Sequence, residues 1–325
     1  MLVLVAGHCC VDITPELGGS IPGVSPGILY PVGELKFKVG GSAPNTGRAL
    51  SILGTNVQLA VAIGDDELGS ICKSQLEATG IPIKLIMSNQ ASSYSIVVEH
   101  GSHDRTFWQH EGSNAAFDPR LLDLDAPRPA MLHVGYPSLL PLTCAEPQAI
   151  ATSFSQAKQR DITTSLDLAH VGEGSIADQV DWESWFKLTL PRTDICSPSW
   201  DDITSALGIP ESPTRTSIES VADQLIEWGA AVVTLSAGSL GFILKTAPKS
   251  RILEAGRVFS GQEDAWSDAT FWFDADHIEH PLTTVGAGDA LTAGLLNGVV
   301  NRLRPEAAGQ HARQVVWRHL HGKLL

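Results

Sequence analysis

The chain has 325 residues, of which 43% are hydrophobic and 18% are charged, and its formal net charge is −14. This composition is typical of a globular protein, and the negative charge disfavours nucleic acid or an anionic membrane as the main partner. No run of about 18 apolar residues occurs, so no transmembrane helix is expected. The five cysteines form no C-x-x-C pair, which is typical of free thiols in the cytoplasm.

Apolar strands and amphipathic helices alternate along most of the chain. The apolar residues 2–6 follow no basic segment and predict a buried strand rather than a signal peptide. Further strands are predicted at residues 57–63, 131–135, 163–168, 193–196 and 231–235. Helices are predicted at residues 42–53, 68–79, 148–159, 218–228, 289–302 and 305–320. This alternation predicts a single α/β domain over residues 1–325, with a doubly wound, mostly parallel sheet flanked by helices.

Two stretches interrupt this alternation. Residues 22–33 are rich in glycine and proline, and residues 35–39 alternate apolar and charged side chains, as a half-exposed strand does. Residues 94–99 and 105–109 predict two more strands joined by a polar turn. Strands of this kind cannot all join a parallel core, so we expect a small β-sheet lid over the active site. The expected lid segments are residues 13–39 and 92–110.

A glycine-rich turn near the C-terminus runs directly into a predicted helix. The turn reads Thr-Val-Gly-Ala-Gly-Asp and ends at Asp289. Backbone N–H groups of such a turn can face an anion, and the start of the helix adds unpaired N–H groups and a positive dipole end. A carboxylate beside that anion is suited to take the proton from a hydroxyl that attacks a phosphoryl group. The alternative is a turn in which Asp289 only caps the helix.

This segment resembles the C-terminal signature of the ribokinase-like (PfkB) carbohydrate and nucleoside kinases, usually D-T-x-G-A-G-D. The resemblance implies that Gly286, Ala287 and Gly288 form the anion hole for the transferred phosphate and that Asp289 is the catalytic base. Thr283 stands where the family has an acidic residue or Asn at the start of the motif.

A second glycine pair, Gly40 and Gly41, begins a segment that resembles the N-terminal signature of the family, G-G-x-x-x-N-x-A. Asn45 offers a donor and an acceptor to a sugar hydroxyl, and the resemblance implies that Asp12, after the first strand, binds sugar hydroxyls as well. Arg105 begins a segment like the R-T-F of the family, so it either contacts the substrate or stabilises the edge of the lid. Without the resemblance, the glycine pair would predict only an ordinary turn.

A third segment resembles the nucleotide loop of the family, K-x-G-x-x-G. It places Ser236, Gly238 and Gly241 after a predicted strand, and a simple hairpin turn is the alternative. Asn297 lies two helical turns after Asp289, on the helix face where family members often contact adenine.

A fourth segment stands where the family has P-N-x-x-E, whose Asn and Glu organise the waters of Mg²⁺. Ser199 and Asp202 occupy these positions. The resemblance implies a nucleotide contact from Ser199 and a water-mediated Mg²⁺ contact from Asp202.

The resemblance implies a cytoplasmic kinase that uses ATP and Mg²⁺ to phosphorylate a hydroxyl of a small sugar or polyol. A homodimer through the lid is compatible with it. The absence of G-x-x-x-x-G-K-[ST] excludes a P-loop kinase. Two alternatives stay open at this point: a nucleoside kinase of the same fold, and a non-catalytic ligand-binding or regulatory protein.

Overall fold

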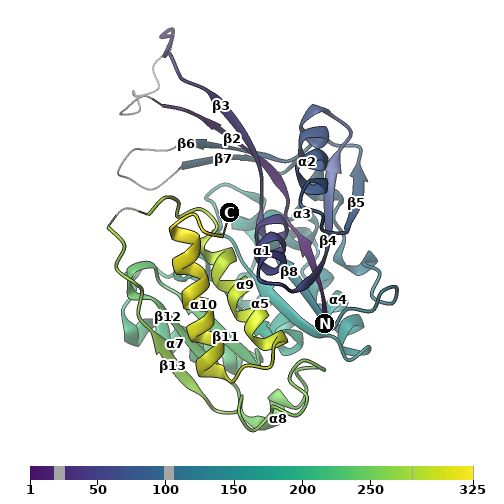
Figure 1. The fold of residues 1–325 in the computed structure, drawn as a ribbon, viewed down its shortest axis with the longest axis vertical. Coiled ribbons are helices and arrows are strands. Elements are labelled where there is room, and N and C mark those ends of the chain that lie inside the picture. Colours follow the sequence, from purple (N-terminus) through teal and green to yellow (C-terminus); the bar gives the residue numbers. More distant parts are fainter. Residues whose placement is uncertain (18–25, 99–105, 280, 325) are drawn as a thin grey trace.

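A computed structural model describes residues 1–17, 26–98, 106–279 and 281–324. Their largest sheet has nine strands in the order β13-β12-β11-β10-β9-β8-β1-β4-β5 (Figure 1). The strands from β11 to β5 run parallel, whereas β12 and β13 are antiparallel additions at one edge. The strands are β1 (Leu2–Gly7), β4 (Asn56–Gly64), β5 (Ile83–Ser88), β8 (Met131–Gly135), β9 (Thr163–Asp167), β10 (Ile195–Cys196), β11 (Val232–Ser236), β12 (Phe242–Thr246) and β13 (Thr270–Phe273). The doubly wound, mostly parallel sheet predicted from the sequence is therefore confirmed.

Helices cover both faces of this sheet because its side chains alternate between two cores. In β1, Val3 and Val5 enter one core, and Leu4 and Ala6 enter the other. The first core packs against α1 (Ser42–Ile52), α2 (Glu67–Glu77), α8 (Lys249–Ile252), α9 (Ala287–Val300) and α10 (Pro305–Leu320). The second packs against α3 (Pro141–Ala145), α4 (Gln148–Lys158), α5 (Trp182–Thr189), α6 (Trp200–Leu207) and α7 (Arg215–Glu227). Among the described helices, none is long and apolar enough to span a membrane.

A separate small sheet extends from the body of the molecule (Figure 1). Its strands, in the order β3-β2-β6-β7, are β2 (Cys10–Pro15), β3 (Leu35–Gly40), β6 (Tyr94–Val98) and β7 (Thr106–His110). The chain passes from β1 in the large sheet to β2 in the small one through His8 and Cys9 alone. The small sheet thus begins at Cys10, ahead of the segment expected from the sequence. Arg105, the predicted substrate contact, lies outside the described residues.

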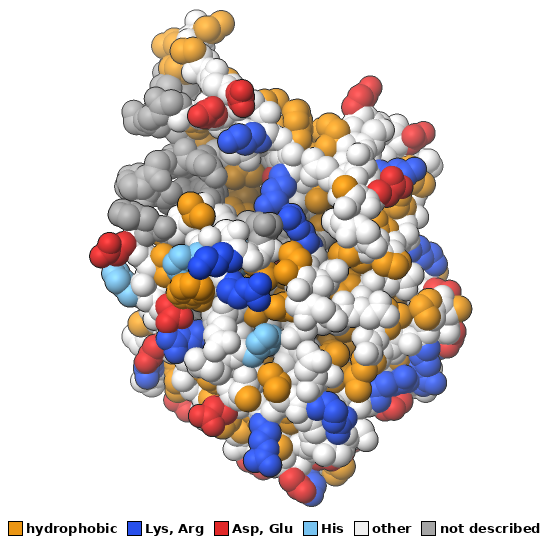
Figure 2. Space-filling view, in the orientation of Figure 1, with side chains coloured by type: hydrophobic (Ala, Val, Ile, Leu, Met, Phe, Trp, Pro, Cys, Tyr) orange, Lys and Arg blue, Asp and Glu red, His pale blue; other side chains and the backbone are white. Residues whose placement is uncertain are grey.

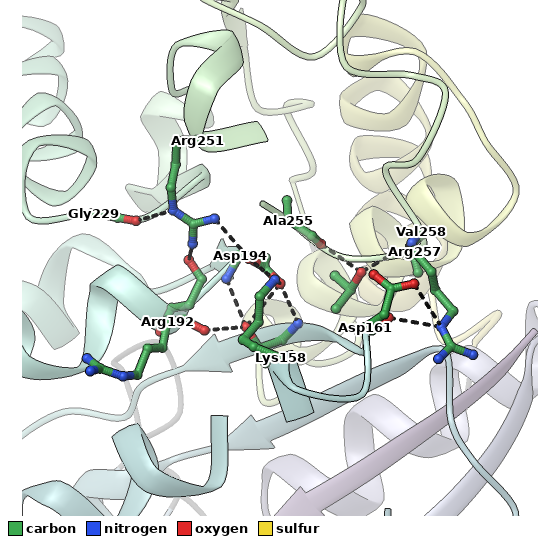
Figure 3. A network of polar contacts seen from close by, with 12 residues as sticks. Lys158, Asp161, Arg192, Asp194, Gly229, Arg251, Ala255, Arg257 and Val258 are labelled. Atoms are coloured by element: carbon green, nitrogen blue, oxygen red, sulfur yellow. Dashed lines mark hydrogen bonds and ion pairs between the residues drawn. The ribbon is translucent and has the colours of Figure 1, made fainter. Parts of the chain in front are cut away.

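A buried ion network joins the large sheet to helices at the amino ends of β9 and β10 (Figure 3). The Asp194 side chain is fully buried, and the Lys158 ammonium donates to its two oxygens at 2.6 and 2.8 Å. The Arg251 guanidinium lies 3.1 Å from the Asp194 carboxylate, and the Thr164 backbone amide donates to the same carboxylate at 2.8 Å. Burial lowers the pKa of Lys158, and Asp194 opposes that shift. The network lies at the opposite end of the strands from the polar loops described next.

Candidate active site

Helix α9 begins at a turn that no side chain caps. Gly286, at the N-cap, has φ 80° and ψ 13°, a left-handed conformation that residues with a Cβ rarely adopt. Ala287, Gly288 and Asp289 then form the first helical turn. Because this turn has no side-chain cap, its amides and the positive end of the helix dipole can receive an anion.

Asp289 is buried in this first turn and accepts hydrogen bonds from helix α1. Its Oδ2 accepts from the Asn45 amide at 3.0 Å, and its Oδ1 accepts from the Thr46 hydroxyl at 3.2 Å. Burial raises the pKa of Asp289 to about 7, although hydrogen bonds from Asn45, Tyr136 and Thr46 lower it in part. A carboxyl group with a pKa near neutrality is well matched to taking a proton from an alcohol.

Two residues without a predicted role lie beside Asp289. Tyr136 follows β8 in a left-handed conformation, with φ 60°, and Asp167 is the last residue of β9. Burial raises the pKa of Asp167 well above its usual range, and the charges of Asp289 and Asp202 raise it further. Burial and the same carboxylates also raise the pKa of Tyr136, which keeps the phenol protonated. Their position at the carboxyl ends of parallel strands, where α/β sheets bind ligands, is the signal that could have identified them.

His8, to which sequence reasoning gave no role, links the small sheet to this site. Its side chain is buried, and its Nε2 accepts from the Gln109 amide of β7 at 2.9 Å. The Nδ1 atom has no protein partner within the described residues, and the ring centroid lies 6.0 Å from that of Tyr136. Burial lowers the pKa of His8 to about 4, so the ring is neutral at pH 7.

The predicted substrate residues of the N-terminal half lie next to one another. They form a strip of Asp12, Gly40, Gly41 and Asn45. Asp12 is half-buried on β2, and a Cβ built on Gly40 would lie 2.2 Å from its Oδ2. Gly41 is the N-cap of α1 with φ 96°, and a Cβ there would lie 2.6 Å from the His8 carbonyl oxygen. Asn45 follows in the first turn of α1 and reaches Asp289. Burial raises the pKa of Asp12, whereas the Cys10 thiol, which donates at 3.4 Å, and Lys38 lower it.

A pocket of about 530 Å³ lies on the other side of the first turn of α9. Three predicted nucleotide residues line it together with two residues of the predicted anion hole, namely Ser236, Gly238, Gly241, Ala287 and Gly288. The short 3₁₀ helix η6 (Gly238–Leu240) joins the antiparallel strands β11 and β12, so this segment is a hairpin turn and also a wall of the pocket. The volume is within the usual range for a small-molecule site.

Ser199, a predicted nucleotide contact, and Asp202, the predicted Mg²⁺ contact through water, cap helix α6 beside this pocket. Ser199 is the N-cap, its hydroxyl accepts from the Asp202 amide at 3.1 Å, and Asp202 Oδ2 accepts from the Ser199 amide at 2.8 Å. The Ser199 backbone forms a β-bridge with Ser236. Burial raises the pKa of Asp202 to about 6.

Asn297, the predicted adenine contact, lies between helices. Its amide donates to the Thr55 hydroxyl at 2.8 Å and to the Leu53 carbonyl at 3.3 Å, and its carbonyl lies 2.9 Å from His311 Nε2. It does not line the 530 Å³ pocket. Because α9 packs between α1 and α10, the face that carries Asn297 points into the protein. The predicted adenine contact is therefore replaced by an interhelical one.

The family pattern described as "pfkB family carbohydrate kinase" matches residues 2–315. The chain belongs to the pfkB family of carbohydrate kinases. Kinases of this family are phosphotransferases.

The fold is similar to that of several solved kinases. A ribokinase from Thermotoga maritima has a TM-score of 0.72 and 15% identity, over 98% of this chain and 93% of that one. Arabidopsis thaliana ribokinase complexed with ribose and ATP has a TM-score of 0.71 and 16% identity, over 98% of each chain. A Burkholderia thailandensis nucleoside kinase in complex with inosine has a TM-score of 0.68 and 14% identity, over 97% of this chain and 89% of that one. At these identities the likeness concerns the fold, which sugar and nucleoside kinases share.

Proposed function

We propose that this pfkB protein transfers the γ-phosphoryl group of ATP to a hydroxyl of a small sugar or polyol. The observation that carries the proposal is the position of the first turn of α9. On one side, Asp289 bonds to Asn45, next to the strip of predicted substrate residues. On the other side, Ala287 and Gly288 line the pocket that also contains the predicted nucleotide turn. An acceptor and a nucleotide bound on the two sides would meet at this turn.

Asp289 acts as the general base in this proposal. The acceptor hydroxyl gives its proton to the Asp289 carboxylate as its oxygen forms a bond to the γ-phosphorus, and the bond from that phosphorus to the bridging oxygen of ADP breaks. The amides of residues 286–288 and the helix dipole stabilise the charge on the transferred group. Asp12 and Asn45 hold the hydroxyls of the acceptor, which favours a polyol over the apolar base of a nucleoside.

Mg²⁺ would neutralise charge on the phosphate oxygens of ATP. Within the described part of the chain, no three His, Cys, Asp or Glu side chains are placed to hold a metal ion. Burial and the charges of Asp289 and Asp202 raise the pKa of Asp167, so the three carboxyl groups lie close enough for one cation to offset their charge. The residues present therefore fit Mg²⁺ held through water and ATP oxygens, with Asp202 as the water contact.

The apolar side chains on the small sheet are compatible with a homodimer through this sheet, which stays part of the proposal. Leu35, Phe37, Phe107 and Trp108 are all exposed there. The molar mass in solution tests it.

The decisive experiment measures ADP release with ATP and Mg²⁺ across pentoses, hexoses, their phosphates and nucleosides, for the wild type and Asp289→Asn. We expect one acceptor class to react and the variant to lose about 10²–10⁴-fold in kcat, the usual scale for loss of a general base. ATP binding, measured by calorimetry, should persist. Near-normal turnover in the variant would show that Asp289 is not the base, and nucleotide binding without turnover of any acceptor would favour a regulatory protein.

Protein stability provides the folding control for this variant. The pKa of Asp289 is raised on folding, so the carboxyl stabilises the fold at low pH and loses that contribution as pH rises through about 7. Removing the ionisable group should therefore leave the variant at least as stable as the wild type above pH 7.

A further inference from the structure

A small cavity of about 90 Å³ lies beside the anion hole, between α1, α2, β3 and the C-terminal end of α10. Lys38 and Arg48 line it together with Asn45, Gly286 and His319. Figure 2 shows Lys and Arg side chains close together on this face, at the hollow below the small sheet. The cavity therefore joins two cations to residues that contact Asp289.

Neither cation forms an ion pair with an acidic side chain among the described residues. Within the described residues, no carboxylate lies in ion-pair distance of Lys38 or Arg48, although the chain has 36 acidic residues and 22 Lys and Arg. Desolvation and the charge of Arg48 lower the pKa of Lys38, and Asp12 opposes the shift. Lys38 is exposed and lies opposite Asp12 in the pairing of β2 with β3, but no ion pair joins these two side chains, so an anion can still bind to Lys38 and Arg48.

One wall of the cavity is fixed by hydrogen bonds on both sides of Lys38. The Gln75 side chain accepts from the Val39 amide at 2.8 Å and donates to the Phe37 carbonyl at 3.0 Å, which fixes both neighbours of Lys38 on β3 against α2. His319 Nε2 donates to the Val285 carbonyl at 2.8 Å, and burial lowers its pKa, so the ring is a neutral wall beside Gly286. The positive charge of the cavity thus comes from Lys38 and Arg48.

We propose that Lys38 and Arg48 bind an anionic oxygen group, a phosphate or a carboxylate, carried by the acceptor itself. The inference rests on the proposed function, because it places the substrate among polyols that carry one such group. Asn45 and Gly286 line the cavity, and Asn45 donates to Asp289 at 3.0 Å, so the cavity with the two cations adjoins the proposed base. Arginine and lysine bind such groups through charge-assisted hydrogen bonds.

The test compares neutral polyols, sugar acids and sugar phosphates as acceptors for the wild type, Lys38→Met and Arg48→Met. Lys36→Met is the matched control, since Lys36 lies two residues earlier on β3 and is exposed like Lys38 but does not line the cavity. We expect an anionic acceptor to have the highest kcat/KM. Each cavity variant should raise the KM of that acceptor by about tenfold or more relative to the KM of ATP, the usual effect of losing one charge-assisted hydrogen bond. The control should behave as the wild type.

A neutral acceptor with the highest kcat/KM, or an unchanged KM in both cavity variants, would overturn the proposal. Free inorganic phosphate also carries anionic oxygens that Lys38 and Arg48 can bind, but it is not part of the acceptor. If phosphate accelerated turnover of a neutral acceptor and Arg48→Met abolished that effect, the cavity would bind a free anion and not the acceptor.

Binding of inorganic phosphate, measured by calorimetry on the wild type and Arg48→Met, separates this proposal from the proposed function. Normal turnover without such binding, and with a neutral acceptor preferred, would reject the anion subsite and keep the kinase. If inorganic phosphate bound in a way that depends on Arg48 but no acceptor were turned over, the kinase proposal would be rejected. The anion in the cavity would then not be part of an acceptor.

Discussion

The Asn45 amide donates to the Asp289 carboxylate at 3.0 Å, although 244 positions separate the two residues. The bond joins the first turn of α1 to the first turn of α9. It stabilises the charged form of Asp289 and so lowers its pKa against the opposing effect of burial. Asn45 Oδ1 has no protein partner among the described residues and can accept from an acceptor hydroxyl. In the proposed reaction, one side chain would thus position the base and face its substrate.

The first prediction concerns pH. Because the pKa of Asp289 is raised to about 7, part of the free enzyme carries a protonated carboxyl at neutral pH, which cannot accept the proton of the acceptor. We expect kcat/KM for the acceptor to rise as pH increases through about 7 and then to level off. A profile measured from about pH 5 to about pH 9 checks this, and a flat profile across neutrality would contradict it.

The second prediction concerns the hydrogen bonds to Asp289. Asn45→Ala removes a donor that lowers the pKa of Asp289, so the inflection of the pH profile should move to higher pH. Asn45→Asp adds a second carboxylate at the same place and should move it further. Thr46→Val is the matched comparison, because it removes the other donor, at 3.2 Å, from the same carboxylate. An inflection unchanged in both Asn45 variants would show that Asp289 is not the titrating group.

The third prediction concerns Gly288, which lines the larger pocket from the first turn of α9. A Cβ built at Gly288 meets no atom within 4 Å, so Gly288→Ala should fold normally, with stability unchanged or raised by up to about 1 kcal/mol. The methyl group would enter the space proposed for the phosphates, and we expect kcat/KM for ATP to fall by about tenfold or more. Gly172→Ala, at another position with no atom within 4 Å, is the control. Wild-type kinetics in Gly288→Ala would place the phosphates elsewhere.

The fourth prediction concerns the buried network in Figure 3. Asp194→Ala leaves Lys158 and Arg251 without their shared partner, so the free energy of unfolding should fall by about 3–5 kcal/mol. Urea denaturation measures the change. Glu183→Ala, which breaks the exposed pair of Glu183 with Lys187, should cost less than about 1 kcal/mol. Equal losses in the two variants would contradict the stabilising role of the network.

Several elements were not predicted because their local pattern is weak. β2 carries a charged residue, β5 has only one fully buried side chain, and β13 has only four residues. Each is fixed by pairing with another strand, which the local sequence pattern does not show. The predicted role of Asn297 failed for a related reason. All residues of α9 from Asp289 onward are buried, so helical periodicity could not indicate which face meets the ligand.

The sequence by itself determined the class of the sheet and the turn that places Asp289 at a helix start. Both depend on local chemistry, namely the run of apolar side chains and the freedom of glycine backbones. Only the tertiary structure decided that Asn45, Tyr136 and Asp167 surround Asp289, and that Lys38 and Arg48 share a cavity beside it. Desolvation and charge interactions act through space, so the protonation of the site follows from contacts between segments far apart in the chain.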